Sequence, residues 1–104
     1  MTEGFAVLDE LAQWIETNRA SLTERGLQLA SGTSPEDGRT KRSMWLDMEG
    51  AQRLGRLQLW DTGEAELELA DVSTGDVKAQ HLQVDTRADL ERALTSLLDW
   101  AGAE

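Results

Sequence analysis

Residues 59–75 read LWDTGEAELELADVSTG, and this stretch decides how the chain folds. Leucines alternate here with glutamates, which is the period of a β-strand with one buried face and one solvated face. The leucines are Leu67 and Leu69, and the glutamates are Glu64, Glu66 and Glu68. Successive glutamates would project from one side about 6.6 Å apart, and like charges in a row destabilise a sheet unless a positive group faces them. The solvated face is therefore a candidate binding surface for a basic partner.

Tight-turn sequences lie on both sides of this strand. Residues 61–63 (DTG) and 73–75 (STG) each place a glycine where a hairpin needs a positive φ. Further strands are predicted at residues 27–31, 43–49, 55–60 and 76–85, and a polar loop at residues 32–42. In the last strand Val77 and Leu82 are separated by an odd interval, which predicts a bulge or a register change.

Amphipathic helices are predicted at both ends of the chain. Residues 3–25 have an apolar stripe at helical spacing, with Thr2 as the N-cap, Gly26 as the terminator and Trp14 packing at the edge of the stripe. The final helix follows Thr86, which forms a capping box with Asp89, and it ends at Gly102. The first stripe comprises Leu8, Leu11, Ile15 and Leu22, and the second Leu90, Leu94, Leu97, Leu98 and Ala101. We expect Trp100 to close the core between helix and sheet.

The predicted order is helix, five short strands, helix, in a single domain over residues 1–104. Strands joined by tight turns favour an α+β fold with an antiparallel meander sheet of about five strands. Both helices should cover one face, because their leucine rows need a partner. The opposite face would carry the candidate partner-binding residues Trp45, Asp47, Glu49, Trp60, Glu64, Glu66 and Glu68. Its two tryptophans either pack across paired strands or serve as interface anchors.

Charge and composition restrict the classes of partner. The 104 residues carry a formal net charge of −10, which opposes binding to nucleic acid or to an anionic membrane. The cluster Arg39, Lys41 and Arg42 lies in the polar loop. The acidity serves either solubility alone or electrostatic steering toward a cationic protein. No apolar run is long enough for a membrane span, and the lack of cysteine suits a reducing compartment, so we expect a cytoplasmic protein.

Motifs that carry chemistry are not found in the sequence. There is no phosphate-binding glycine loop, nucleophile elbow, zinc spacing or calcium loop. His81 has no cysteine or second histidine with which to share a metal, so we interpret it as an ordinary surface residue. The glutamate pairs lie on an open strand, where their pKa values have little reason to separate. We therefore expect no catalytic residues, no metal and no cofactor.

At these residues the chain resembles the TriTu family of bacterial immunity proteins. The resemblance covers the leading amphipathic helix, SMWLDMEG at residues 43–50, RLQLWDTGEAELELADVSTGDV at residues 56–77, and the leucine-rich helix that contains Trp100. It implies a cytoplasmic antidote, encoded beside a polymorphic toxin delivered by a bacterial secretion system such as type VI. It further implies that the antidote binds the catalytic domain of that toxin, an ADP-ribosyltransferase that modifies elongation factor Tu. No binding residues are carried over from the family.

Two other classes of protein remain as alternatives. A small acidic secretion chaperone shares the size and charge, but such chaperones resemble α/β homodimers with a helix inserted between strands. A small enzyme would need a buried pair of titrating groups, and the sequence shows none.

Overall fold

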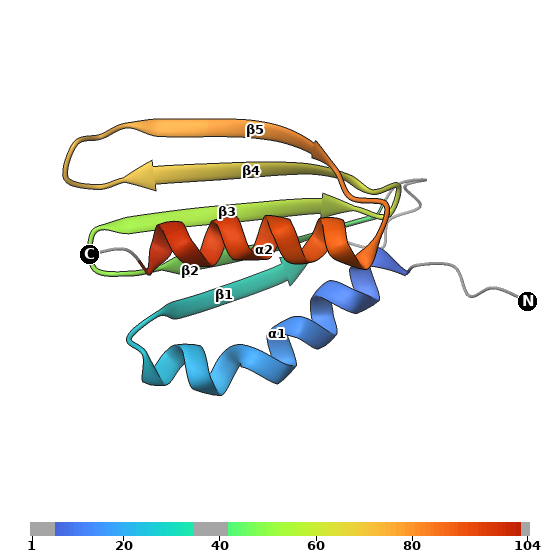
Figure 1. Ribbon diagram of the computed structural model, residues 1–104, viewed down its shortest axis with the longest axis horizontal. Helices are drawn as coiled ribbons and strands as arrows, with labels where there is room; N and C mark the ends of the chain where they lie inside the picture. Colours follow the sequence, from blue (N-terminus) through green and yellow to red (C-terminus); the bar gives the residue numbers. More distant parts are fainter. Residues whose placement is uncertain (1–5, 35–41, 103–104) are drawn as a thin grey trace, which may run out of the picture.

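The computed structural model describes residues 6–34 and 42–102. Within these residues two helices flank a five-stranded sheet in the order that the sequence predicts, and Figure 1 shows their arrangement. The elements are α1 (Val7–Glu24), β1 (Gln28–Thr33), β2 (Ser43–Glu49), β3 (Arg53–Trp60), β4 (Glu64–Asp71), β5 (Val77–Gln83) and α2 (Arg87–Ala101).

The sheet is an antiparallel meander in which every strand pairs with its neighbour in sequence, in the order β1-β2-β3-β4-β5. The two predicted turn glycines, Gly63 and Gly75, have φ angles of +93° and +80°, which a side chain would strain. The fold class predicted from the alternation and the turns is therefore confirmed.

Strand β5 is regular, in contrast to the bulge or register change predicted for it. Its register against β4 is continuous, from the pair Glu64 and Gln83 to the pair Ala70 and Val77. The prediction of a bulge or a register change is therefore wrong. Val77 lies opposite Ala70, whereas Leu82 lies opposite the buried Ala65. The odd interval between Val77 and Leu82 arises because the two side chains lie on opposite faces of a regular strand.

The ends of both helices follow local rules. Helix α1 begins at Val7 with Ala6 as an N-cap that makes no side-chain hydrogen bond, and the predicted cap Thr2 lies outside the described residues. Gly26, with a φ of +91°, follows α1 as predicted. In α2 the Thr86 hydroxyl accepts from the Asp89 N–H, and the Asp89 carboxylate accepts from the Thr86 N–H, which confirms the capping box.

Both helices pack on one face of the sheet and form a single core with it (Figure 1). Helix α2 lies close to β3 at Gly55, where a Cβ would lie only 2.4 Å from Cδ1 of Leu97. Leu67 is buried in this core, and Leu69 and Trp14 pack at its edge. Within the described residues, the opposite face of the sheet has no helix upon it, as predicted.

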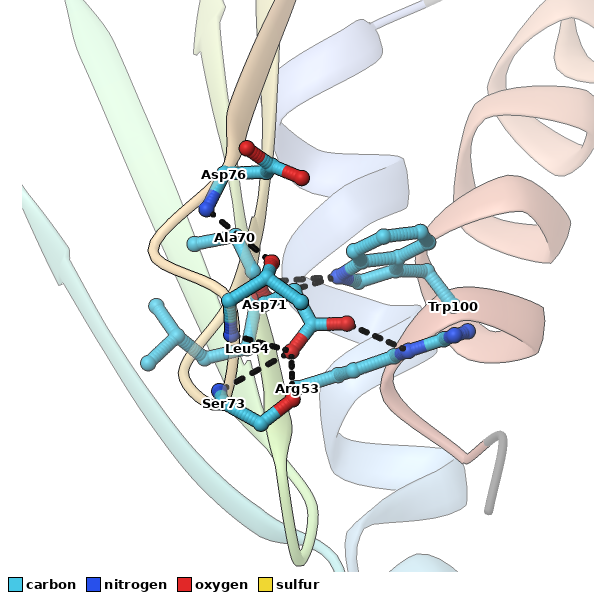
Figure 2. Close-up of polar contacts among 8 residues, drawn as sticks. Arg53, Leu54, Ala70, Asp71, Ser73, Asp76 and Trp100 are labelled. Atoms are coloured by element: carbon cyan, nitrogen blue, oxygen red, sulfur yellow. Dashed lines mark hydrogen bonds and ion pairs between the residues drawn. The ribbon is translucent and has the colours of Figure 1, made fainter.

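Trp100 joins the C-terminal end of α2 to strands β3 and β4 (Figure 2). Its indole Nε1 donates to the carbonyl oxygens of Leu54, at 3.2 Å, and Ala70, at 3.0 Å. The Arg53 guanidinium lies over the indole ring, 4.3 Å from its centroid, and also lies 3.6 Å from a carboxylate oxygen of Asp71. Trp100 thus connects helix and sheet through hydrogen bonds at the end of the sheet, and the expected closing of the core by its ring stays a prediction.

Candidate functional site

The uncovered face of the sheet, here called the open face, carries all seven residues predicted for it. The register connects Trp45 and Asp47 of β2 through alternate residues of β3 to Glu66 and Glu68 of β4, and it places Glu49 opposite Leu54 on the same face. The seven are Trp45, Asp47, Glu49, Trp60, Glu64, Glu66 and Glu68. Three strands with regular register therefore bring together residues that are up to 23 positions apart in sequence (68 − 45).

Arg56 lies at the centre of the open face and pairs with Asp47 on the neighbouring strand. Its Nε and Nη2 donate to the two carboxylate oxygens of Asp47 at 2.6 and 2.9 Å. This hydrogen bonding raises the pKa of Arg56, and the charges of Asp47 and Glu68 act in the same direction against the opposing effect of burial. This pairing neutralises one of the carboxylates on the open face, which the sequence did not reveal.

Trp45 packs upon its own sheet. A Cβ at Gly32, its cross-strand partner on β1, would lie 2.6 Å from Cζ2 of the indole, so the ring covers the glycine backbone. The Arg56 guanidinium lies 4.9 Å from the centroid of the same ring, which is a cation–π distance. Trp60 is half-buried and also interacts within the chain. Of the two interpretations of these tryptophans, the structure shows cross-strand packing for Trp45, and the role as interface anchor stays a prediction.

The β4 glutamates supply three of the five carboxylates on the open face. Glu66 pairs across the strands with His81, whose Nδ1 lies 2.8 Å from Oε2 of Glu66, and His81 is an exposed residue as predicted. Glu68 is exposed beside Arg56, and Glu64 interacts within the chain. Among the described residues, the open face has five carboxylates and one guanidinium, a net charge of about −4 (1 − 5) when His81 is neutral.

Sequence reasoning missed an apolar row on the open face. Leu54 of β3, Ala70 of β4 and Val77 of β5 are aligned across three strands, and Leu54 and Val77 are 38% and 65% exposed. The tight turn at residues 73–75 could have identified the row, because a hairpin there pairs Ala70 with Val77 and places both on the glutamate face.

Two other carboxylates with shifted pKa belong to local turns and caps. Hydrogen bonds from Ser73 lower the pKa of Asp71, and hydrogen bonds from the backbone of Asp85 and from Thr86 lower the pKa of Asp89. No cluster of three or more potential metal-ligating side chains occurs in the described part of the chain. Neither α1 nor α2 is long and apolar enough to cross a membrane.

Comparison with known proteins identifies the family. A family model described as immunity protein TriTu matches residues 9–100, a range that begins within α1 and ends at Trp100 of α2. The match therefore includes all five strands and every predicted partner-binding residue. No match was found among curated proteins. The chain thus belongs to the TriTu family of immunity proteins, and its role is to neutralise a toxin, which is its protein partner.

Proposed function

We propose that this protein is a cytoplasmic, non-enzymatic inhibitor that binds the catalytic domain of an ADP-ribosyltransferase toxin delivered by a secretion system such as type VI. The open face of the sheet is the binding surface, and it covers the cleft in which the toxin holds its cofactor or its target. The observation that carries this proposal is the charge of that face, five carboxylates against one guanidinium among the described residues.

The charge suits the expected partner. A transferase that binds NAD has to accommodate two phosphate groups, and phosphate sites are built from positive side chains and N–H donors. An acidic sheet face placed over such a cleft would meet an electrostatically complementary surface and would exclude the anionic cofactor or the target protein. Long-range attraction between the two surfaces would also accelerate association at low salt.

The experiment compares two triple variants that change the net charge equally. One carries Glu64→Gln, Glu66→Gln and Glu68→Gln on the open face. The other carries Glu16→Gln, Glu91→Gln and Asp99→Asn at exposed positions on the helices. Association with the toxin domain encoded by the adjacent gene is measured by stopped flow over a range of salt concentrations. We expect the open-face variant to associate more slowly, with a weaker salt dependence, and the helix variant to behave like the wild type.

A second variant tests the tryptophan anchor. Trp60→Ala should weaken binding by on the order of 2 kcal/mol or more, mainly through faster dissociation. Urea unfolding of each variant provides the folding control, because Trp60 also interacts within the chain. Equal binding by all folded variants would show that the open face is not the interface.

A separate experiment tests whether the immunity protein is an enzyme. Inhibition of the transferase should be complete at one equivalent of the immunity protein and should be reversed when the complex dissociates. Release of ADP-ribose from modified elongation factor Tu by this protein would instead identify an enzyme that reverses the modification.

A further inference from the structure

An acidic depression with an apolar floor lies at one end of the open face. The floor consists of Leu54, Ala70 and Val77, here called the Leu54–Val77 patch, and the register places the three side chains in a row across β3, β4 and β5. Alanine in the middle of the row leaves a dip between the two larger side chains. The resulting depression has a volume of about 370 Å³, and its other lining residues are Asp47, Met48, Glu49, Arg56 and Glu68.

The exposure of this patch is unusual for the molecule. Three large hydrophobic residues are exposed in the described part of the chain, and Leu54 and Val77 are two of them. The third, Val72, lies in the turn between β4 and β5 and does not line the depression. Single exposed apolar side chains are ordinary on a protein surface, whereas aligned ones around a concave floor are typical of binding sites.

The charges around the floor determine which side chain it suits. The lining includes three carboxylates and one guanidinium, and the guanidinium of Arg56 is already held by both oxygens of Asp47. Glu49 and Glu68, both exposed, lie on either side of β3 and supply the remaining negative charge. An apolar floor with carboxylates at its rim fits a long side chain with an aliphatic stem and a cationic head.

The floor is supported from the other side of the sheet. The carbonyl groups of Leu54 and Ala70 accept the hydrogen bonds of the Trp100 indole (Figure 2). The Asp71 carboxylate, which pairs with Arg53 above that indole, also accepts from the N–H and hydroxyl of Ser73 at 2.9 and 2.6 Å. Two of the three floor residues are thus held in place before a partner arrives, which lowers the entropic cost of binding.

We propose that the Leu54–Val77 patch is the subsite that anchors the toxin, and that its occupant is an arginine or lysine side chain of the toxin. The stem of that side chain lies across Leu54, Ala70 and Val77, and its cationic head pairs with Glu49 and Glu68. This inference rests on the proposed function and adds the position of the anchor, which lies at the opposite end of β3 from Trp60.

The test uses a pair of valines with matched exposure. Val77 is 65% exposed inside the patch and Val72 is 64% exposed outside it, so Val77→Ser and Val72→Ser remove similar amounts of apolar surface. With the toxin domain from the adjacent gene as the probe, we expect Val77→Ser to raise the dissociation constant at least tenfold and Val72→Ser to change it less than twofold. In the wild-type protein, methyl NMR should show the Leu54 and Val77 resonances shifting on titration while those of Val72 stay in place.

Substitutions in both proteins test whether the cationic head pairs with Glu49 and Glu68. Glu49→Gln with Glu68→Gln should accelerate dissociation about tenfold, because a lost contact acts on the off-rate whereas lost steering acts on the on-rate. Substitution of each surface arginine and lysine of the toxin domain by methionine should identify one residue whose effect is not additive with this double variant. Additivity for every basic residue would overturn the identity of the occupant.

The outcomes separate this inference from the proposed function. The anchor is overturned if the complex tolerates both Val77→Ser and Val72→Ser and if the Leu54 methyl resonances do not shift. If that complex still depends on the β4 glutamates, the open face remains the interface. Absence of any complex overturns both.

Discussion

Replacing Gly55 with alanine tests how closely α2 docks on the sheet. The new Cβ would lie 2.4 Å from Cδ1 of Leu97 and 3.2 Å from the backbone carbonyl oxygen of Glu68. Leu97 is 0% exposed, so its methyl cannot move aside into solvent. Overpacking of this kind costs about 1–3 kcal/mol, and the reduced freedom of the unfolded chain returns about 0.4–1 kcal/mol. We expect the free energy of unfolding to fall by on the order of 1–2 kcal/mol.

A double-mutant cycle isolates the contact. Leu97→Ala alone leaves a cavity and should cost about 2–5 kcal/mol. In the Gly55→Ala background the same truncation removes the clash, and the new methyl enters the vacated space. The double variant should therefore be more stable than the sum of the single effects by about 1 kcal/mol or more. The matched control is Leu11→Ala in the other helix, α1, because Leu11 is as fully buried as Leu97, and its effect should be additive with Gly55→Ala.

Urea unfolding followed by tryptophan fluorescence and far-UV circular dichroism measures these free energies. In thermal unfolding, each kcal/mol lost from the free energy of unfolding should lower Tm by about 4–8 °C for a domain of this size. A Gly55→Ala variant within about 0.5 kcal/mol of the wild type, or strict additivity with Leu97→Ala, would refute the close docking of α2 on β3.

Three further perturbations test individual hydrogen bonds that stabilise the fold. Trp100→Phe keeps an aromatic ring but removes the single indole N–H that the carbonyl oxygens of Leu54 and Ala70 share, so the free energy of unfolding in urea should fall by about 1–3 kcal/mol. Thr86→Ala removes the cap of α2 and should cost about 0.5–2 kcal/mol by the same measurement, with Thr86→Ser close to wild type. The pKa values of Asp71 and Asp89 are lowered in the folded state, so the stability they contribute is present above the ordinary value of 3.8 and is lost as pH falls through the folded values. Unfolding measured from pH 6 to pH 2.5 should show this acid-side loss, and it should be smaller when Asp89→Asn is introduced; an unchanged profile would argue against the folded-state hydrogen bonds of Asp89.

The sequence alone was sufficient to predict the elements and the sidedness of the sheet. The alternation of Leu67 with Glu66 and Glu68 has the period of a strand and records directly which side chains are buried. The turn glycines and the capping box are equally local, because each depends on a backbone conformation or a hydrogen bond within a few residues. These signals were therefore read correctly, apart from the start of α1 and the regularity of β5.

Tertiary structure decided the contacts across strands that the site depends on. The pairing of Arg56 with Asp47, the stacking of Trp45 on Gly32 and the Leu54–Val77 patch all depend on strand register. Register is a relation between segments, and a shift by one residue would move every one of these side chains to the other face. The sequence thus determined that this protein has an acidic face with tryptophans, because composition and period are properties of single strands. Only the folded sheet decided which of those charges are paired and where the exposed apolar floor lies among them, because these depend on how neighbouring strands align.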